Sequence, residues 1–115
     1  MLTAAPPRMF IGVAPVDLRR GLDGLCAVIQ HHLALTPFDG AWYLFRNKAS
    51  TRLNVVVFDG TGFWLCYRRL ERGTWVWPKA DDQVMTLSYA QFLVLIQGAD
   101  WRRIQTPAEI RPSLI

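Results

Sequence analysis

The chain has 115 residues, 51% of them hydrophobic and 12% aromatic, enough to bury the core of one domain, which excludes a disordered chain. No apolar run approaches the roughly 20 residues that cross a membrane, and no signal-peptide pattern is present, so we expect a soluble, cytoplasmic protein. The net charge is +4, and eleven of the 13 basic residues are arginine. Arginine suits phosphate and carboxylate partners, so the composition favours an anionic partner, nucleic acid first.

The first third of the chain predicts a strand and a helix. Residues 8–13 read Arg-Met-Phe-Ile-Gly-Val, an apolar run that Pro15 ends. Asp17 can cap a helix, because its carboxylate accepts backbone N–H groups. The apolar residues that follow have helical spacing: Leu22, Leu25, Cys26, Ile29 and Leu33. Thr36-Pro37 ends this helix. We expect Cys26 and Cys66 to be buried thiols, with a disulfide between them as the less favoured alternative.

The strongest structural pattern lies at residues 53–78. Two runs of β-branched and aromatic residues flank the turn Asp59-Gly60-Thr61-Gly62, which is the composition of a β-hairpin. Pairing Phe58 with Phe63 across the turn sets a register in which Arg52 lies opposite Arg69. Together with residues 41–46 before the hairpin and residues 74–77 after it, the pattern predicts a four-stranded antiparallel meander.

The second helix is predicted by a capping box, in which Ser88 and Gln91 precede an apolar run that ends before Gly98. The elements together predict a single α+β domain over residues 1–101. We expect an antiparallel meander sheet of four to five strands, with two helices packed mainly on one face. Residues 102–115 are basic, contain prolines and lack periodicity, which predicts a flexible C-terminal tail.

A cluster of cations follows from this topology, because alternate turns of a meander lie at the same end of the sheet. The turn after residue 46 and the turn after residue 69 would bring six cations together against one acid, Glu71. We predict nucleic-acid contacts for Arg46, Lys48, Arg52, Arg68, Arg69 and Arg72. The aromatic residues available for stacking on bases are Tyr67, Phe58, Phe63 and Trp75. The alternative is a solvated rim beside buried aromatics.

Patterns for catalysis are weak. His31 and His32 are adjacent, so they project about 100° apart on a helix and do not face one ion easily. Neither histidine accompanies a recognisable nucleophile, and no glycine-rich phosphate loop precedes a helix. Asp59 and Glu71 are expected at opposite ends of the sheet, too far apart to share Mg²⁺. The sequence therefore predicts no enzyme, metal or cofactor, with a metal-dependent nuclease as a weak alternative.

Several blocks occur in the order and spacing of one known family: residues 17–25 (Asp-Leu-Arg-Arg-Gly-Leu-Asp-Gly-Leu), 37–40, 45–48, 58–63, 67–73 (Tyr-Arg-Arg-Leu-Glu-Arg-Gly), 77–78, 87–91 and 98–101. The chain resembles the Orf2-like, or TnpB, accessory proteins of insertion-sequence-66-type bacterial transposable elements. The resemblance implies a role in DNA transposition beside a separate transposase that carries the catalytic acids. One departure is at residues 51–54, Thr-Arg-Leu-Asn, where the family usually has Asp-Arg-[Leu/Ile]-Lys.

Two functions remain open from the sequence. The first is a non-catalytic accessory factor in DNA transposition that contacts the DNA of the element ends through the arginine-rich rim. The second is a protein-interaction module that docks on the transposase or its companion proteins without direct DNA binding, to which five tryptophans are suited. The residues predicted to contact such a partner are Asp17, Arg19, Arg20, Asp23, Trp75 and Trp77. A homo-oligomer is compatible with either function.

Overall fold

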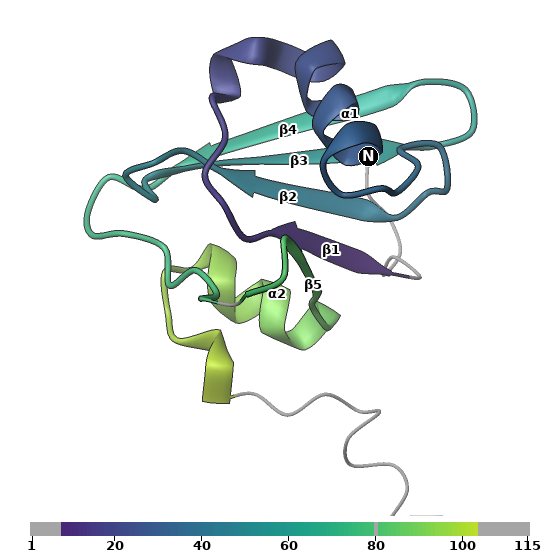
Figure 1. Cartoon of the computed structure of the whole chain (residues 1–115). Helices are drawn as coiled ribbons and strands as arrows, with labels where there is room; N and C mark the ends of the chain where they lie inside the picture. Colours follow the sequence, from purple (N-terminus) through teal and green to yellow (C-terminus); the bar gives the residue numbers. More distant parts are fainter. Residues whose placement is uncertain (1–7, 80, 104–115) are drawn as a thin grey trace, which may run out of the picture.

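Five strands form one mixed sheet in the order β4-β3-β2-β1-β5 (Figure 1). The computed structural model describes residues 8–79 and 81–103. The strands are β1 (Met9–Gly12), β2 (Trp42–Arg46), β3 (Arg52–Phe58), β4 (Phe63–Arg69) and β5 (Val84–Thr86). The helices are α1 (Gly21–His31) and α2 (Tyr89–Ile96), and two short 3-10 helices are η1 (Leu18–Arg20) and η2 (Trp101–Arg103). The predicted α+β class is confirmed.

The antiparallel meander covers β2, β3 and β4. The predicted register of the hairpin is confirmed, since Phe58 pairs with Phe63 and Arg52 pairs with Arg69. Asp59 closes its turn by accepting the N–H groups of Thr61 and Gly62, both at 2.9 Å. These hydrogen bonds are the largest of the causes that lower the pKa of Asp59 to about 2.

The sheet differs from the predicted meander at both of its ends. Residues 74–77 form no strand. The indole rings of Trp75 and Trp77 pack instead in the core on the α2 side of the sheet. Trp77 Nε1 donates to the carbonyl oxygen of Gly12 at 2.7 Å. The remaining strands are β1, which lies parallel to β2, and β5, which pairs antiparallel with β1. The sheet is therefore mixed rather than purely antiparallel.

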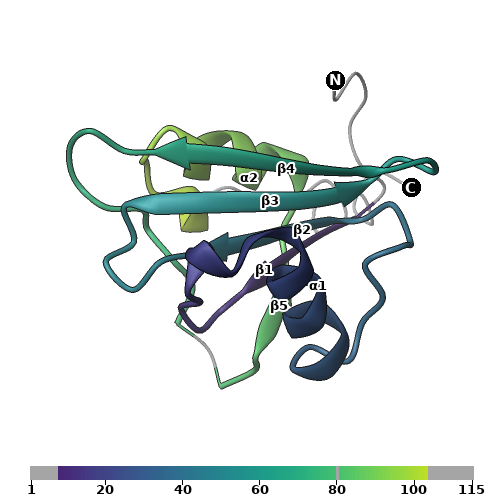
Figure 2. The same ribbon diagram turned by 90° about the horizontal axis from the view of Figure 1, so that it is seen from above.

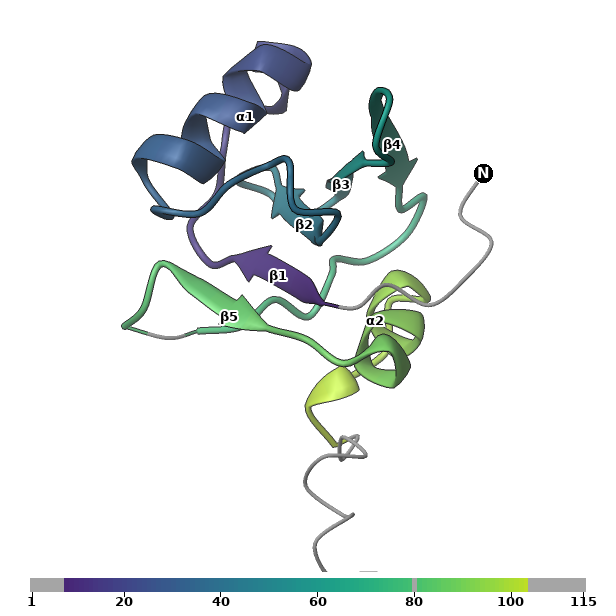
Figure 3. The same cartoon turned by 90° about the vertical axis from the view of Figure 1, so that its right-hand side faces the viewer.

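The two helices lie on opposite faces of the sheet (Figure 3), whereas the sequence predicted them mainly on one face. Parallel neighbours such as β1 and β2 need a long crossover between them, and α1 supplies it on one side of the sheet. Strand β2 is consequently buried on both faces. Its Trp42 and Leu44 side chains pack on the α2 side, and its Tyr43 and Phe45 side chains pack on the α1 side.

The start of the first helical region contains a break that sequence periodicity did not show. Asp17 caps η1 by accepting the N–H of Arg19 at 3.0 Å. Gly21 follows with φ 70°, a left-handed conformation that glycine adopts without steric cost, and α1 begins there. Helix α1 ends at His31, five residues before the predicted end at Thr36. The capping box of Ser88 and Gln91 is confirmed at the start of α2.

The sheet separates the two cysteines. Cys26 packs on the α1 side and Cys66 on the α2 side, so they form no disulfide with each other. Burial raises the pKa of both thiols. Among the described residues, no helix is long and apolar enough to span a bilayer. Arg102 belongs to η2, and the remainder of the predicted tail, residues 104–115, lies outside the described residues.

Candidate nucleic-acid interface

The hairpin register brings Arg52 and Arg69 face to face at the end of the sheet farthest from the Asp59 turn. Both side chains lie on the α1 side, because side chains two residues apart share a face and Val56 packs there. Glu71 offsets one of the charges, since Arg69 Nη2 lies 3.0 Å from its Oε1, and this contact raises the pKa of Arg69. Arg52 is exposed and has no side-chain partner within residues 8–79 and 81–103.

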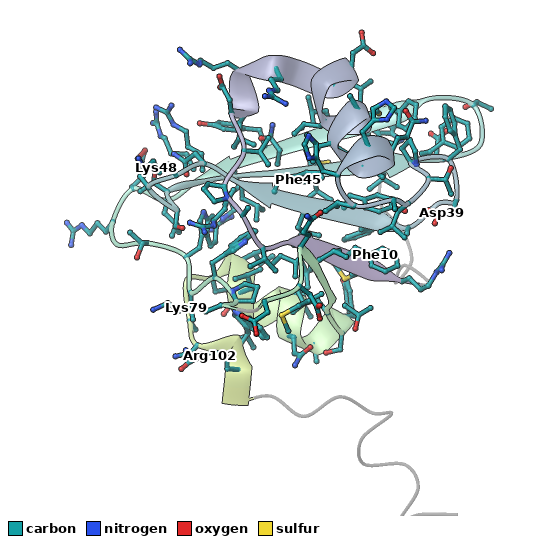
Figure 4. All side chains as sticks on the ribbon, in the orientation of Figure 1. Phe10, Asp39, Phe45, Lys48, Lys79 and Arg102 are labelled. Atoms are coloured by element: carbon teal, nitrogen blue, oxygen red, sulfur yellow. The ribbon has the colours of Figure 1, made fainter. Side chains whose placement is uncertain are left out.

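The β2–β3 turn carries Lys48 (Figure 4), which lines the same groove as Arg52. Asn47 fixes the turn from inside: its Oδ1 accepts the N–H groups of Thr51 and Arg52, both at 2.9 Å. Ser50 adopts φ 56° to complete the reversal of the chain. Lys48 at the tip is exposed and has no side-chain partner among the described residues. The turn is thus held rigidly while its cation stays available.

Arg46 points inward, unlike the other cations predicted for this surface. Its Nη1 donates to Ser50 Oγ at 2.9 Å, and its Nη2 donates to the carbonyl oxygen of Val13 at 3.2 Å. The guanidinium also lies over the Trp77 ring, 5.9 Å from its centroid. Burial lowers the pKa of Arg46. The side chain braces β2 against neighbouring segments and is not placed on the exposed rim.

The two remaining predicted cations lie apart from the pair of Arg52 and Arg69. Arg68 is the Cα partner of Leu53, whose side chain packs on the α2 side, so Arg68 projects from the opposite face. Arg72 lies in the turn that follows β4 and is exposed. The structure therefore divides the six predicted cations among the two faces, the turns and the interior.

A groove on the α1 side adds a cation that the sequence did not group with them. Residues 15–19 run alongside the β2–β3 turn and enclose about 560 Å³ of space, with Arg19, Lys48 and Arg52 in its wall. Arg19 is held by Asp17 through two hydrogen bonds, from Nε at 2.9 Å and from Nη2 at 3.0 Å. Its side chain remains 91% exposed. The groove thus presents three cations against one carboxylate.

Asp17 is engaged within the groove. Hydrogen bonds from the Arg19 side chain, followed by its backbone N–H, lower the pKa of Asp17 to about 2, so the carboxylate is ionised at neutral pH. It holds Arg19 over the groove and caps η1 at the same time. The sequence predicted both residues on a separate protein-binding surface. It gives no sign that they lie near Lys48 and Arg52, because only the tertiary fold brings η1 next to the β2–β3 turn.

The other four residues predicted to contact a protein partner differ in their exposure. Arg20 and Asp23 are exposed at the start of α1. Arg20 also lines a cavity of about 330 Å³, which includes apolar Pro15, Val16 and Leu33. Trp75 and Trp77 are 3% and 7% exposed, so the structure buries them in the core and contradicts their placement on an interface.

One of the four aromatic residues proposed for stacking is exposed beside the cations. Tyr67 is 58% exposed on β4, on the same face as Arg69 and two residues before it. Phe58 and Phe63 are half-buried and pack on each other with ring centroids 5.0 Å apart. Trp75 is buried, as noted above. Tyr67 alone of these residues therefore combines exposure with a position next to Arg52 and Arg69.

The carboxylates lie as the hairpin register predicts. Asp59 is at the far end of β3 and β4 from Glu71, so the two cannot share an ion. In the described part of the chain, no group of three histidine, cysteine or acidic residues is arranged to hold a metal.

Comparisons with known proteins point to one family. The family model described as IS66 Orf2-like protein matches residues 7–106. Two proteins of Sinorhizobium fredii are similar over most of their length. The uncharacterized protein y4jC is 33% identical over 108 residues, which cover 94% of this chain and 92% of y4jC. The uncharacterized protein y4hO is 38% identical over 98 residues, which cover 85% of each chain. No solved structure matches.

Proposed function

Because the chain belongs to the IS66 Orf2-like family, whose members are accessory proteins of transposition, we propose that it acts by contacting the phosphate backbone of DNA without catalysing a reaction. The observation that carries this proposal is the groove in which Arg19, Lys48 and Arg52 converge. Cations gathered on a small domain attract a polyanion and raise its rate of encounter.

The state of the individual cations supports a phosphate partner. Lys48 and Arg52 have no side-chain partner among the described residues, and Arg19 reaches the groove with its side chain largely exposed. A phosphate would supply the counter-charge that Arg52 lacks opposite Arg69, whose own charge Glu71 offsets. Arg69 and Arg72 would extend the contact along the rim. Tyr67 is the residue placed to stack on an unpaired base.

The test is a salt-titrated binding assay with duplex DNA that carries the ends of the element. The variant Lys48→Ala/Arg52→Ala removes two cations from the groove. The matched control, Lys79→Ala/Arg102→Ala, also removes one lysine and one arginine, but on the α2 side of the sheet (Figure 4). Each lost phosphate contact should reduce the slope of log K against log salt by about 0.9.

We expect affinity to fall steeply with salt for wild type and control, and the groove variant to bind more weakly with a slope smaller by about 1–2. The proposal fails if wild-type binding is insensitive to salt. It also fails if the control loses as much affinity and slope as the groove variant, since the groove would then have no special part in binding.

A second candidate function is docking on the transposase or another protein of the same element. The cavity beside α1 favours it, because apolar Pro15, Val16 and Leu33 adjoin the charged side chains of Arg20 and Asp17 there. Such a pocket suits one apolar side chain of a partner. Pull-down of the transposase that is lost with Leu33→Glu but kept with Lys48→Ala/Arg52→Ala would support this function, and failure of wild type to retain the transposase would refute it.

A further inference from the structure

Strand β4 lies at one edge of the sheet (Figure 2), and several of its apolar side chains are exposed. It has seven residues, and its described strand partner is β3. Its exposed fractions are 41% for Trp64, 40% for Leu65 and 58% for Tyr67, and no charged residue occurs before Arg68. Edges of this kind readily pair with another strand, and natural proteins usually protect them with charge, proline or a covering segment.

The hairpin register determines which backbone groups of β4 face outward. Asp59 N–H donates to Gly62 O at 3.0 Å, and Leu70 N–H donates to Thr51 O at 2.9 Å. Hydrogen-bonded pairs alternate with non-bonded pairs along an antiparallel ladder, so even-numbered residues of β4 bond to β3. The N–H and C=O groups of the odd-numbered residues, Phe63, Leu65, Tyr67 and Arg69, therefore point away from the sheet.

We propose that β4 pairs antiparallel with β4 of a second copy of this chain, joining two five-stranded sheets into one. In the register that pairs all seven residues, the two-fold axis passes through Cys66. Leu65 then lies opposite Tyr67 of the second copy, and the outward backbone groups of both strands meet in hydrogen-bonded pairs.

The two cations of β4, Arg68 and Arg69, do not oppose each other across the interface in this register. Arg68 meets Trp64 on the α2 side, and Arg69 meets Phe63 on the α1 side, so each cation faces an aromatic ring and none faces another cation. Phe63 already packs with Phe38, their ring centroids 5.3 Å apart, and Phe38 is 56% exposed. Registers centred on Arg68 or Arg69 would instead oppose two guanidinium groups. The inference does not depend on DNA contact.

The first test is sedimentation of the full chain without DNA over a range of concentrations. The variant Leu65→Glu/Tyr67→Glu places like charges opposite each other at two symmetric positions. The matched variant Leu65→Glu/Tyr67→Lys removes the same apolar side chains but restores opposite charges. Both positions are exposed in one copy, so both variants should fold, which circular dichroism checks.

We expect wild type to dimerise, the Glu/Glu variant to raise the dimer Kd by about tenfold or more, and the Glu/Lys variant to stay closer to wild type. A wild-type chain that remains monomeric throughout, or two variants that dimerise equally well, would overturn the proposal. So would capture of a strand from a different protein in place of self-association.

The second test uses the position of Cys66 on the axis. Residues facing each other in a non-hydrogen-bonded pair have Cα atoms about 4.5 Å apart, which lies within the range that a disulfide spans. In a Cys26→Ser chain, the mild oxidant diamide should take two electrons and two protons from a pair of Cys66 thiols and leave a covalent dimer. The same chain with Cys66→Ser should give none. Dimers that sediment but do not cross-link would overturn this register.

Discussion

Replacing Arg46 and Arg52 one at a time should separate stability from DNA binding, although the two residues lie at the same end of the sheet. Arg46 is half-buried and donates to Ser50 Oγ and to Val13 O. Arg52 is exposed on the neighbouring strand, opposite Arg69. We expect Arg46→Ala to destabilise the fold while leaving DNA affinity unchanged, and Arg52→Ala to weaken DNA binding while leaving the fold intact.

The magnitude follows from the contacts that each substitution removes. Arg46→Ala removes two hydrogen bonds of ordinary length from a charged donor, each worth about 1.5–3 kcal/mol, and a long one of 3.5 Å to Lys48 O that adds little. It also removes a contact with the Trp77 ring worth about 0.5–1 kcal/mol. Part of this loss is offset, because the buried Arg46 Nε has no hydrogen-bond partner among the described residues, and the substitution removes the free-energy cost of burying that group. A net cost of about 2–3 kcal/mol remains, or a fall in Tm of about 8–12 °C. Arg52→Ala should change stability by less than about 0.5 kcal/mol.

Urea unfolding gives the free energy of unfolding of each variant, and fluorescence anisotropy with labelled DNA gives the affinity at temperatures where both variants are folded. Equal m-values would show that the two variants unfold to comparable states. The reasoning is refuted if Arg46→Ala is as stable as Arg52→Ala, because the inward contacts would then contribute nothing. If folded Arg46→Ala lost more DNA affinity than Arg52→Ala, the assignment of DNA contact to Arg52 rather than to Arg46 would be wrong.

Three further predictions concern the framework that holds the candidate interface. Because the pKa of Asp59 is lowered to about 2, its stabilisation of the hairpin should be complete above about pH 4 and lost as the pH falls through 2, which NMR titration of the carboxyl group can follow; a carboxyl that titrates near 4 would contradict this. Burial, followed by a hydrogen bond of 3.0 Å from the Tyr43 hydroxyl to the Asp39 carboxylate, raises the pKa of Tyr43, so its phenol should resist ionisation at pH values where exposed tyrosines ionise in a spectrophotometric titration. Tyr43→Phe should lower the free energy of unfolding by about 1–2 kcal/mol, because it removes the hydrogen bond of 2.7 Å from the same hydroxyl to Thr36 O. Trp77→Phe removes the buried bond to Gly12 O and should cost about 1–3 kcal/mol in urea unfolding, whereas an unchanged midpoint would show that this contact does not support β1.

Much of the local structure was determined by the sequence itself. The turn Asp59-Gly60-Thr61-Gly62 fixes the β3–β4 register through the Asp59 carboxylate and short-range backbone bonds, so the meeting of Arg52 and Arg69 could be predicted. The capping box of α2 could be predicted for the same reason, since Ser88 and Gln91 bond within one helical turn. These interactions join residues that are neighbours in the chain, and residue type at fixed spacing is enough to specify them.

The layers of the fold had a signal in the sequence, but the signal was ambiguous. Trp42, Tyr43, Leu44 and Phe45 form an unbroken apolar run, as expected of a strand covered on both faces. An unbroken run does not say which segment covers which face. The parallel pairing of β1 with β2 and the crossover through α1 decided that, and they placed α2 on the opposite side.

The candidate interface itself was decided by tertiary structure. Whether an arginine faces solvent or the interior depends on what packs against its strand: the carbonyl of Val13 and the ring of Trp77 draw Arg46 inward, while Arg52 stays exposed six residues later. Arg19 joins Lys48 and Arg52 because η1 passes beside the β2–β3 turn. The sequence determined that cations gather at this end of the sheet, since strand register is a local property. Only the long-range contacts decided which of them remain available to a partner, because burial is set by segments distant in the chain.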